Sequence, residues 1–123
     1  MDKSYADITA EINRGILKLR RGVPDAMAGF SAMAKGALKS GALSELQKEL
    51  IALSIGVAVH CDGCIGFHTK SLVRLGATRD QVMEALAVAV YMGGGPSLMY
   101  AAEAVHAYDQ FAGIPNTVTA VPA

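Results

Sequence analysis

Apolar residues recur at helical intervals along nearly the whole chain. In residues 4–20, Ile8, Ile12, Ile16 and Leu17 follow a period near 3.6 and would share one face of a helix. The alternating apolar and polar pattern of a half-buried strand is not found anywhere in the sequence. The hydrophobic pattern therefore predicts an all-α fold.

Capping residues and helix breakers divide this pattern into about six helices. Ser44 with Gln47 and Thr78 with Gln81 have the spacing of capping boxes, which open helices. Proline suits the first turn of a helix and glycine its end, and such residues are found at Pro24, Gly41, Gly76 and Pro96. The predicted helices cover about residues 4–20, 24–39, 44–59, 61–75, 78–92 and 96–111. The tail, 112–123, has no charge and no helical period and is predicted to be extended.

Two of the predicted helices lack a polar face. Leu50 to Val59 is apolar except for Ser54, and Val82 to Met92 is apolar except for Glu84. A helix that is apolar on every side must be buried all round. A domain of six helices can hardly enclose two such helices by itself, so we expect the chain to form a closed homo-oligomer.

Composition and charge exclude several classes of protein. Eleven basic residues balance eleven acidic ones, and 52% of the chain is apolar, so neither a nucleic-acid partner nor a disordered chain is expected. The longest apolar run is about half of the roughly 20 residues that a membrane span needs. The N-terminus has no secretory pattern, and we therefore expect a cytoplasmic protein. In that reducing compartment a C-x-x-C pair is more often catalytic or metal-binding than structural.

Candidate chemistry is concentrated in residues 60–68, HCDGCIGFH, which contain both cysteines of the chain. If the helix is regular from Cys61, the spacing of three and four residues places Cys61, Cys64 and His68 on one face. The positive end of the helix dipole and a nearby histidine both favour a reactive thiolate. Two cysteines at this spacing can also close a disulfide. The helix terminus favours Cys61 as the attacking sulfur, whereas His68 favours Cys64, so the order remains open.

Glu49 lies within the apolar stripe of the preceding helix. A carboxylate in such a stripe needs a polar partner, and His68 is the natural candidate. A Glu–His–Cys proton relay is therefore chemically coherent. His60 would tune the thiols or be structural. His106 is expected to be structural, and Glu84 and Glu103 are expected to pair with basic residues at an interface.

Two other interpretations of this segment remain. Cys61, Cys64 and His68, with either Glu49 or His60, could supply four zinc ligands. Structural zinc sites usually draw two ligand pairs from separated loops, and this chain has one pair. A helical scaffold with incidental thiols would leave the spacing of the acid and the histidine unexplained.

The pattern of Glu49, eleven residues, Cys61, two residues, Cys64, three residues and His68 resembles the signature of the alkylhydroperoxidase AhpD-like, or carboxymuconolactone decarboxylase, family. GATRDQVMEALAVAVYMGGGPSLMYAAEA, residues 76–104, resembles the next two helices of that family and the glycine-rich break between them. The resemblance covers about residues 25–111. The AhpD pattern has a histidine before the second cysteine where this chain has Gly63, and AhpD has a second helical unit.

The resemblance implies a single all-α AhpD-like domain over residues 1–123, assembled as a homotrimer or homohexamer. It implies an antioxidant oxidoreductase of peroxiredoxin type, a thiol-dependent peroxidase or disulfide reductase without metal or other cofactor. Its substrate would be a hydroperoxide, and its reductant a thiol, a dithiol or a redox partner protein. Carried over, Cys64 attacks the hydroperoxide, Cys61 resolves the product, and His68 and Glu49 relay protons. A lyase of the carboxymuconolactone decarboxylase type is the alternative, although those enzymes generally lack the cysteine pair.

Overall fold

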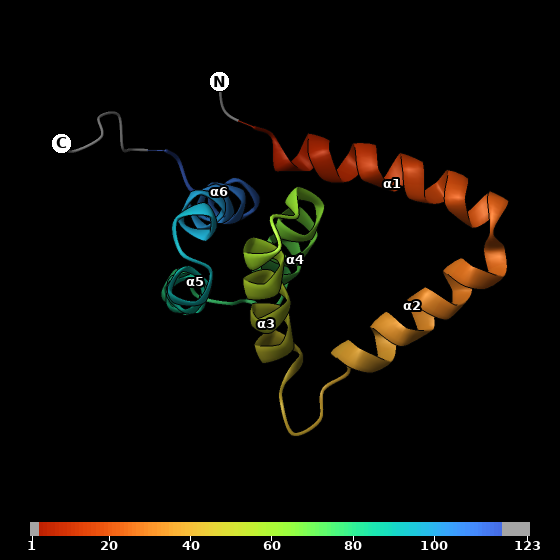
Figure 1. The fold of residues 1–123 in the computed structure, drawn as a ribbon, viewed down its shortest axis with the longest axis horizontal. Coiled ribbons are helices and arrows are strands. Elements are labelled where there is room, and N and C mark those ends of the chain that lie inside the picture. Colours follow the sequence, from red (N-terminus) through yellow and green to blue (C-terminus); the bar gives the residue numbers. More distant parts are fainter. Residues whose placement is uncertain (1–2, 117–123) are drawn as a thin grey trace.

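The computed structural model describes residues 3–116 and is all-α, as the hydrophobic pattern predicts. Six helices follow one another, and no strand occurs within the described residues (Figure 1). They are α1 (Tyr5–Gly22), α2 (Pro24–Leu38), α3 (Glu45–Ala58), α4 (Asp62–Arg74), α5 (Arg79–Gly93) and α6 (Gly95–Ala112). No helix in this part of the chain is long and apolar enough to span a membrane.

Local capping chemistry sets several of the helix boundaries. Both predicted capping boxes are present: the hydroxyl groups of Ser44 and Thr78 accept hydrogen bonds from the third residue of α3 and of α5. The glycine-rich break is shorter than expected, because α5 ends at Gly93 and α6 begins at Gly95. Gly94 alone turns the chain, at a φ of 74° that other residues rarely adopt.

The core lies between α3, α4, α5 and α6. Its largest fully buried side chains on α3 and α4 include Leu53, Val57, Ile65 and Leu72. Burial of these side chains fixes the two helices that carry the cysteine segment and Glu49 against each other.

The first turns of α1 cross α4 at two glycines. A Cβ atom added to Gly63 would lie 2.8 Å from Ile12 Cδ1, and one added to Gly66 would lie 2.6 Å from Thr9 Cγ2. Side chains at these positions would hold the helices apart. Gly63 is the position at which the AhpD pattern has a histidine, and here it provides the close approach of α1.

The rest of α1 extends away from the core, and α2 turns back toward the start of α3 without packing into the core (Figure 1). α2 has no buried residue, and its Phe30 and Met33 are largely exposed. The expectation that the two apolar helices are buried all round does not hold within one chain. Ile55 on α3 and Val88 on α5 are 57% and 60% exposed, because only one face of each helix packs into the core.

Candidate active site

Cys61 caps the N-terminus of α4 instead of lying in its first turn. Its backbone is extended, at φ −110° and ψ 100°, and the helix begins one residue later, at Asp62. The prediction of a regular helix from Cys61 is therefore wrong by one residue. An N-cap residue has non-helical backbone angles, and its side chain turns back to accept a hydrogen bond from an N–H of the first turn. Here Cys61 Sγ accepts that bond from the N–H of Cys64, at 3.1 Å.

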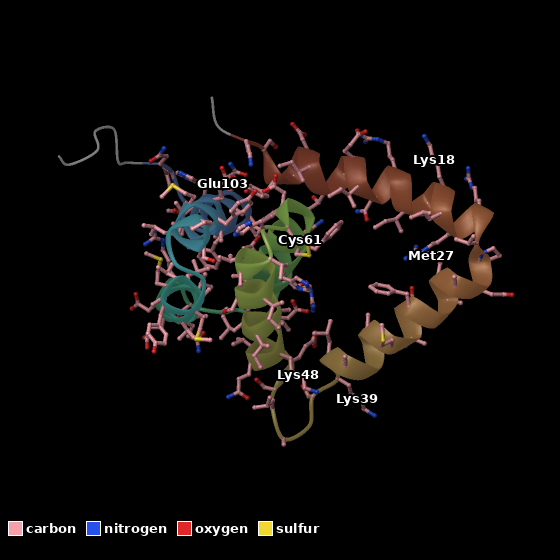
Figure 2. The ribbon with its side chains drawn as sticks, in the orientation of Figure 1. Lys18, Met27, Lys39, Lys48, Cys61 and Glu103 are labelled. Carbon is pink, nitrogen blue, oxygen red and sulfur yellow. A yellow bond between two sulfur atoms is a disulfide. The ribbon has the colours of Figure 1, made fainter. Side chains whose placement is uncertain are left out.

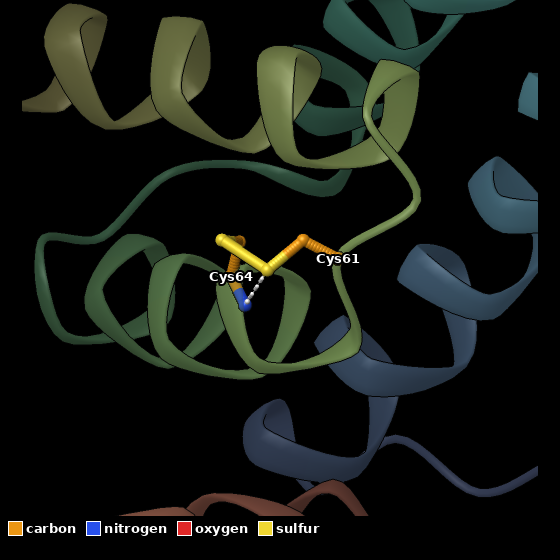
Figure 3. Close-up of a disulfide and its surroundings, with 2 residues drawn as sticks. All are labelled: Cys61 and Cys64. Carbon is orange, nitrogen blue, oxygen red and sulfur yellow. Dashed lines mark hydrogen bonds between the residues drawn. A yellow bond between two sulfur atoms is a disulfide. The ribbon is translucent and has the colours of Figure 1, made fainter. Parts of the chain in front are cut away.

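The two cysteines are joined by a disulfide across this first turn (Figure 3). Their Cα atoms are 5.2 Å apart, a separation common among disulfides. Both residues are half-buried. The backbone of Gly56 on α3 lies close beside Cys64, since a Cβ atom added to that glycine would be 2.9 Å from Cys64 Cβ. The pair therefore lies in the contact between α3 and α4.

Glu49 and His68 meet as the apolar stripe predicts. Oε2 of Glu49 lies 2.6 Å from Nδ1 of His68. Glu49 is only 3% exposed, so the imidazole is the polar partner that its buried carboxylate requires. When Nδ1 carries the proton that binds Glu49, Nε2 remains for exchange with another group. Cys64 precedes His68 by four residues on α4, which is one helical turn.

His60 forms the turn that leads into Cys61. It has a φ of 60°, in the left-handed region that non-glycine residues seldom adopt. Its ring stacks on Tyr100 of α6, with centroids 4.6 Å apart and planes inclined by 8°. The backbone N–H of Cys61 donates to the carbonyl of Gly56 at 2.9 Å. These contacts tie the turn to α6 and to α3, while a tuning role for His60 remains a prediction.

A cluster of four side chains lies at the same end of α4 and was not predicted from the sequence. Lys3 Nζ lies 3.2 Å from Asp62 Oδ2 and 3.1 Å from Glu103 Oε2. The buried hydroxyl of Tyr5 donates a hydrogen bond to the same Glu103 oxygen. Glu103 was expected to pair with a basic residue at an interface, but these partners belong to its own chain. No sequence signal connects Tyr5 with a residue 98 positions away.

This cluster shifts the protonation of its members. Burial, followed by the hydrogen bond to Glu103, raises the pKa of Tyr5, so the phenol stays neutral. Burial would raise the pKa of Glu103, but the hydrogen bonds from Tyr5 and Lys3 outweigh it and lower that pKa. The hydrogen bond to Glu103 chiefly raises the pKa of Lys3, against a smaller opposing effect of burial.

The two remaining candidate residues lie on the surface of the chain. Glu84 on α5 and His106 on α6 are exposed in the single chain. Within residues 3–116, no three or more His, Cys, Asp or Glu side chains are grouped as ligands for a metal ion.

Comparison with known proteins places these features in a family. The sequence profile of the carboxymuconolactone decarboxylase family matches residues 24–107, a range that includes all four candidate catalytic residues. A crystal structure of a family member from Legionella pneumophila, without ligand, superposes with a TM-score of 0.87 at 52% identity, covering 88% of this chain and 96% of that one.

Two further relatives are uncharacterized proteins. One, from Cupriavidus necator, is 43% identical over 80% of this chain and 88% of its own length. The other, from the cox locus of Paracoccus denitrificans, is 37% identical over 68% of this chain and 76% of its own. With its profile match, its fold and these relatives, the chain belongs to the carboxymuconolactone decarboxylase family, in which the AhpD-like proteins are included.

Proposed function

We propose that the protein is a thiol-dependent oxidoreductase that reduces hydroperoxides through the Cys61–Cys64 pair. One observation carries this proposal: a disulfide at the start of α4 lies one helical turn from a histidine hydrogen-bonded to a buried carboxylate. The first feature can exchange two electrons, and the second can move a proton. A peroxidase cycle requires both.

The reduced enzyme would begin the cycle with Cys64. His68, oriented by Glu49, takes the thiol proton, and the thiolate attacks the outer oxygen of a hydroperoxide. The O–O bond breaks, the sulfur is oxidised to a sulfenic acid, and the alkoxide leaves as an alcohol with the proton from His68. Cys61 then attacks the sulfenic sulfur. The S–S bond forms, the S–O bond breaks, and hydroxide leaves as water with the proton of the Cys61 thiol.

An external dithiol would close the cycle. One of its sulfurs attacks Cys61 and releases Cys64 as a thiolate. Its second sulfur then attacks the mixed disulfide, releases Cys61 and leaves the dithiol oxidised. The N–H of Cys64, which already points at Cys61 Sγ, would stabilise the thiolate released in this last step (Figure 3). Dependence on a thiol donor fits a cytoplasmic location.

The division of roles between the cysteines predicts distinct phenotypes for their variants. Cys64→Ser should abolish hydroperoxide consumption, because no sulfur remains beside His68. Cys61→Ser should allow one turnover, which ends at a sulfenic acid that a dimedone probe traps and intact mass detects. Consumption that continues in the double serine variant would overturn the proposal.

The proton relay predicts a separate loss. Glu49→Gln keeps the size of the side chain but removes its charge, and it should slow peroxide consumption about a hundredfold because His68 loses the carboxylate that supports its proton transfer. Glu84→Gln, on the exposed face of α5, is the matched control and should leave the rate unchanged. Stopped-flow consumption of a small alkyl hydroperoxide measures both rates. A wild-type rate in Glu49→Gln would remove the relay from the mechanism.

We also propose that the working form is a closed homo-oligomer, a trimer or a hexamer. The exposed apolar faces of α3 and α5 and the unburied helix α2 support this assembly. Each further copy of the chain brings apolar faces of its own, and contacts repeated around a rotation axis that closes give a ring.

A further inference from the structure

The N-terminus of α4, where Cys61 is the N-cap residue, carries a cluster of charged side chains. Asp62 directly follows that cysteine and is the first residue of the helix. Lys3 bridges Asp62 and Glu103 at 3.2 and 3.1 Å, and the Tyr5 hydroxyl donates to the same oxygen of Glu103 that Lys3 contacts. The segment before α1, the N-terminus of α4 and the middle of α6 are far apart in the sequence and meet beside the N-cap residue Cys61.

The charges in this cluster do not cancel. Two carboxylates and one ammonium group leave a net charge of −1, and Tyr5 is neutral because burial and its hydrogen bond raise its pKa. Oδ1 of Asp62 is buried and has no hydrogen-bond partner within the described residues. Lys3 Nζ contacts the other oxygen of this carboxylate, Oδ2, at 3.2 Å. A negative charge on the residue that follows Cys61 opposes a thiolate on that cysteine, whereas the ammonium group of Lys3 favours one.

We propose that Lys3 is a positioning residue for the redox pair: by binding Asp62 and Glu103, its ammonium group favours the thiolate form of Cys61. This inference rests on the proposed function and names a group outside the predicted site. A larger thiolate fraction on Cys61 speeds its attack on the sulfenic sulfur. It also makes Cys61 a better leaving group when the external dithiol completes reduction.

Other titratable groups surround α4 and remain unchanged in the test. They are His60 in the preceding turn, Glu49 on α3, His68 on α4 itself, Tyr5 on α1, and Tyr100, Glu103 and His106 on α6. Because every variant retains them, differences between variants report the charges of Lys3 and Asp62.

Titration of Cys61 in a Cys64→Ser background tests the proposal without any peroxide. Lys3→Met leaves both carboxylates uncompensated and should raise the pKa of the Cys61 thiol by about half to one unit, which slows alkylation at pH 7 about three- to tenfold. Asp62→Asn should shift that pKa by a similar amount in the opposite direction. The double variant restores the net charge of the cluster and should titrate near the parent protein. Thiolate absorbance at 240 nm and iodoacetamide alkylation measure these shifts.

Two control variants separate charge from structure. Lys18→Met removes an ammonium group from the far part of α1, well away from Cys61, and should leave the titration unchanged (Figure 2). Lys3→Arg keeps the charge and should behave as the parent does. If Lys3→Met does not fold, Asp62→Asn still tests the sign, since the proposal requires it to lower the pKa of the Cys61 thiol while Lys3→Arg leaves that pKa unchanged.

Opposite shifts for Lys3→Met and Asp62→Asn support the proposal. Shifts in the same direction would mean that the contact only holds the turn in shape, and the absence of a shift would mean that the cluster does not act on the sulfur. Either result overturns the inference. Because the titration uses no oxidant, failure of hydroperoxide turnover in the wild-type protein would overturn the proposed function and leave this result intact.

Discussion

Glu103 on α6 is a single residue that links two distant segments: its carboxylate binds Tyr5, the first residue of α1, and Lys3, which precedes that helix. Burial works against its charge, but the two hydrogen bonds prevail and lower its pKa. A carboxylate whose pKa is lower in the folded state than in the unfolded chain stabilises the fold at pH values above its unfolded-state pKa, which is about 4.3 for glutamate. That stabilisation is lost as the pH falls through the pKa that Glu103 has in the folded protein.

Glu103→Gln should therefore reduce the free energy of unfolding by about 1 kcal/mol at pH 7, because the charge-assisted bonds are only partly shielded from water. The difference from wild type should shrink below about pH 4 and vanish once the carboxylate is protonated. Urea unfolding at pH 7, 5, 4 and 3 measures it, with Glu84→Gln as the control. A difference that stays constant across this range would show that the ionised form is not what stabilises the fold.

Contacts between single residues differ in how far they can be predicted from the sequence. Glu49 and His68 could be paired in advance, because a carboxylate in an apolar stripe needs a polar partner and the histidine lies on the adjacent helix. The partners of Glu103 could not, because Lys3 and Tyr5 are about a hundred residues away and share no pattern with it. The positive φ of His60 could not be predicted either, since histidine, although enriched at positive φ, adopts the left-handed region too rarely for its presence to indicate such a turn.

At the level of elements, the contact between α3 and α4 depends on Gly56. Gly56→Ala would place a Cβ atom 2.9 Å from Cys64 Cβ, an atom that cannot move without its backbone. Alanine adds about 0.5–1 kcal/mol of helix propensity, but overpacking typically costs about 1–3 kcal/mol. We expect a net loss of about 1 kcal/mol in the free energy of unfolding, together with slower closure of the disulfide.

The control is Gly29→Ala on α2, where an added Cβ atom meets nothing within 4 Å. This variant should gain about 0.5–1 kcal/mol from propensity alone. Chemical denaturation of the oxidised proteins compares the two variants. If Gly56→Ala were as stable as Gly29→Ala, the close approach of α3 and α4 at the cysteines would not matter.

Element boundaries were largely predictable because capping is local. Ser44 and Thr78 predict the starts of α3 and α5 because each forms a capping box with a glutamine only three positions away, and both starts are confirmed. The N-cap position of Cys61 was not predictable in this way, because cysteine is not among the usual N-cap residues. The direction of α2 was not predictable, since nothing in its own sequence states which surface its apolar residues meet.

The molecule as a whole has more surface than a compact chain of its size. Its accessible area is 8054 Å², compared with about 6,300 Å² expected for a compact 12.8 kDa monomer. Part of the exposed apolar surface lies in a groove between α3 and α5, lined by Leu50, Ile51, Ser54, Ile55, Ala85 and Val88. The two helices predicted to be buried all round are the ones that line it. Their sequences therefore match an environment that one chain does not provide.

A second copy of the chain seated on this groove would supply that environment, and Val88 provides the test. Val88→Glu adds a charge at a side chain that is 60% exposed in the single chain, so the fold of each subunit should survive while association weakens. Light scattering coupled to size-exclusion chromatography should give three or six times 12.8 kDa for the wild type and a smaller mass for the variant. Lys70→Gln makes the same change in net charge at an exposed position on α4 and should keep the wild-type mass. A monomeric wild type, or an unchanged assembly in Val88→Glu, would mean that this groove is not where the copies meet.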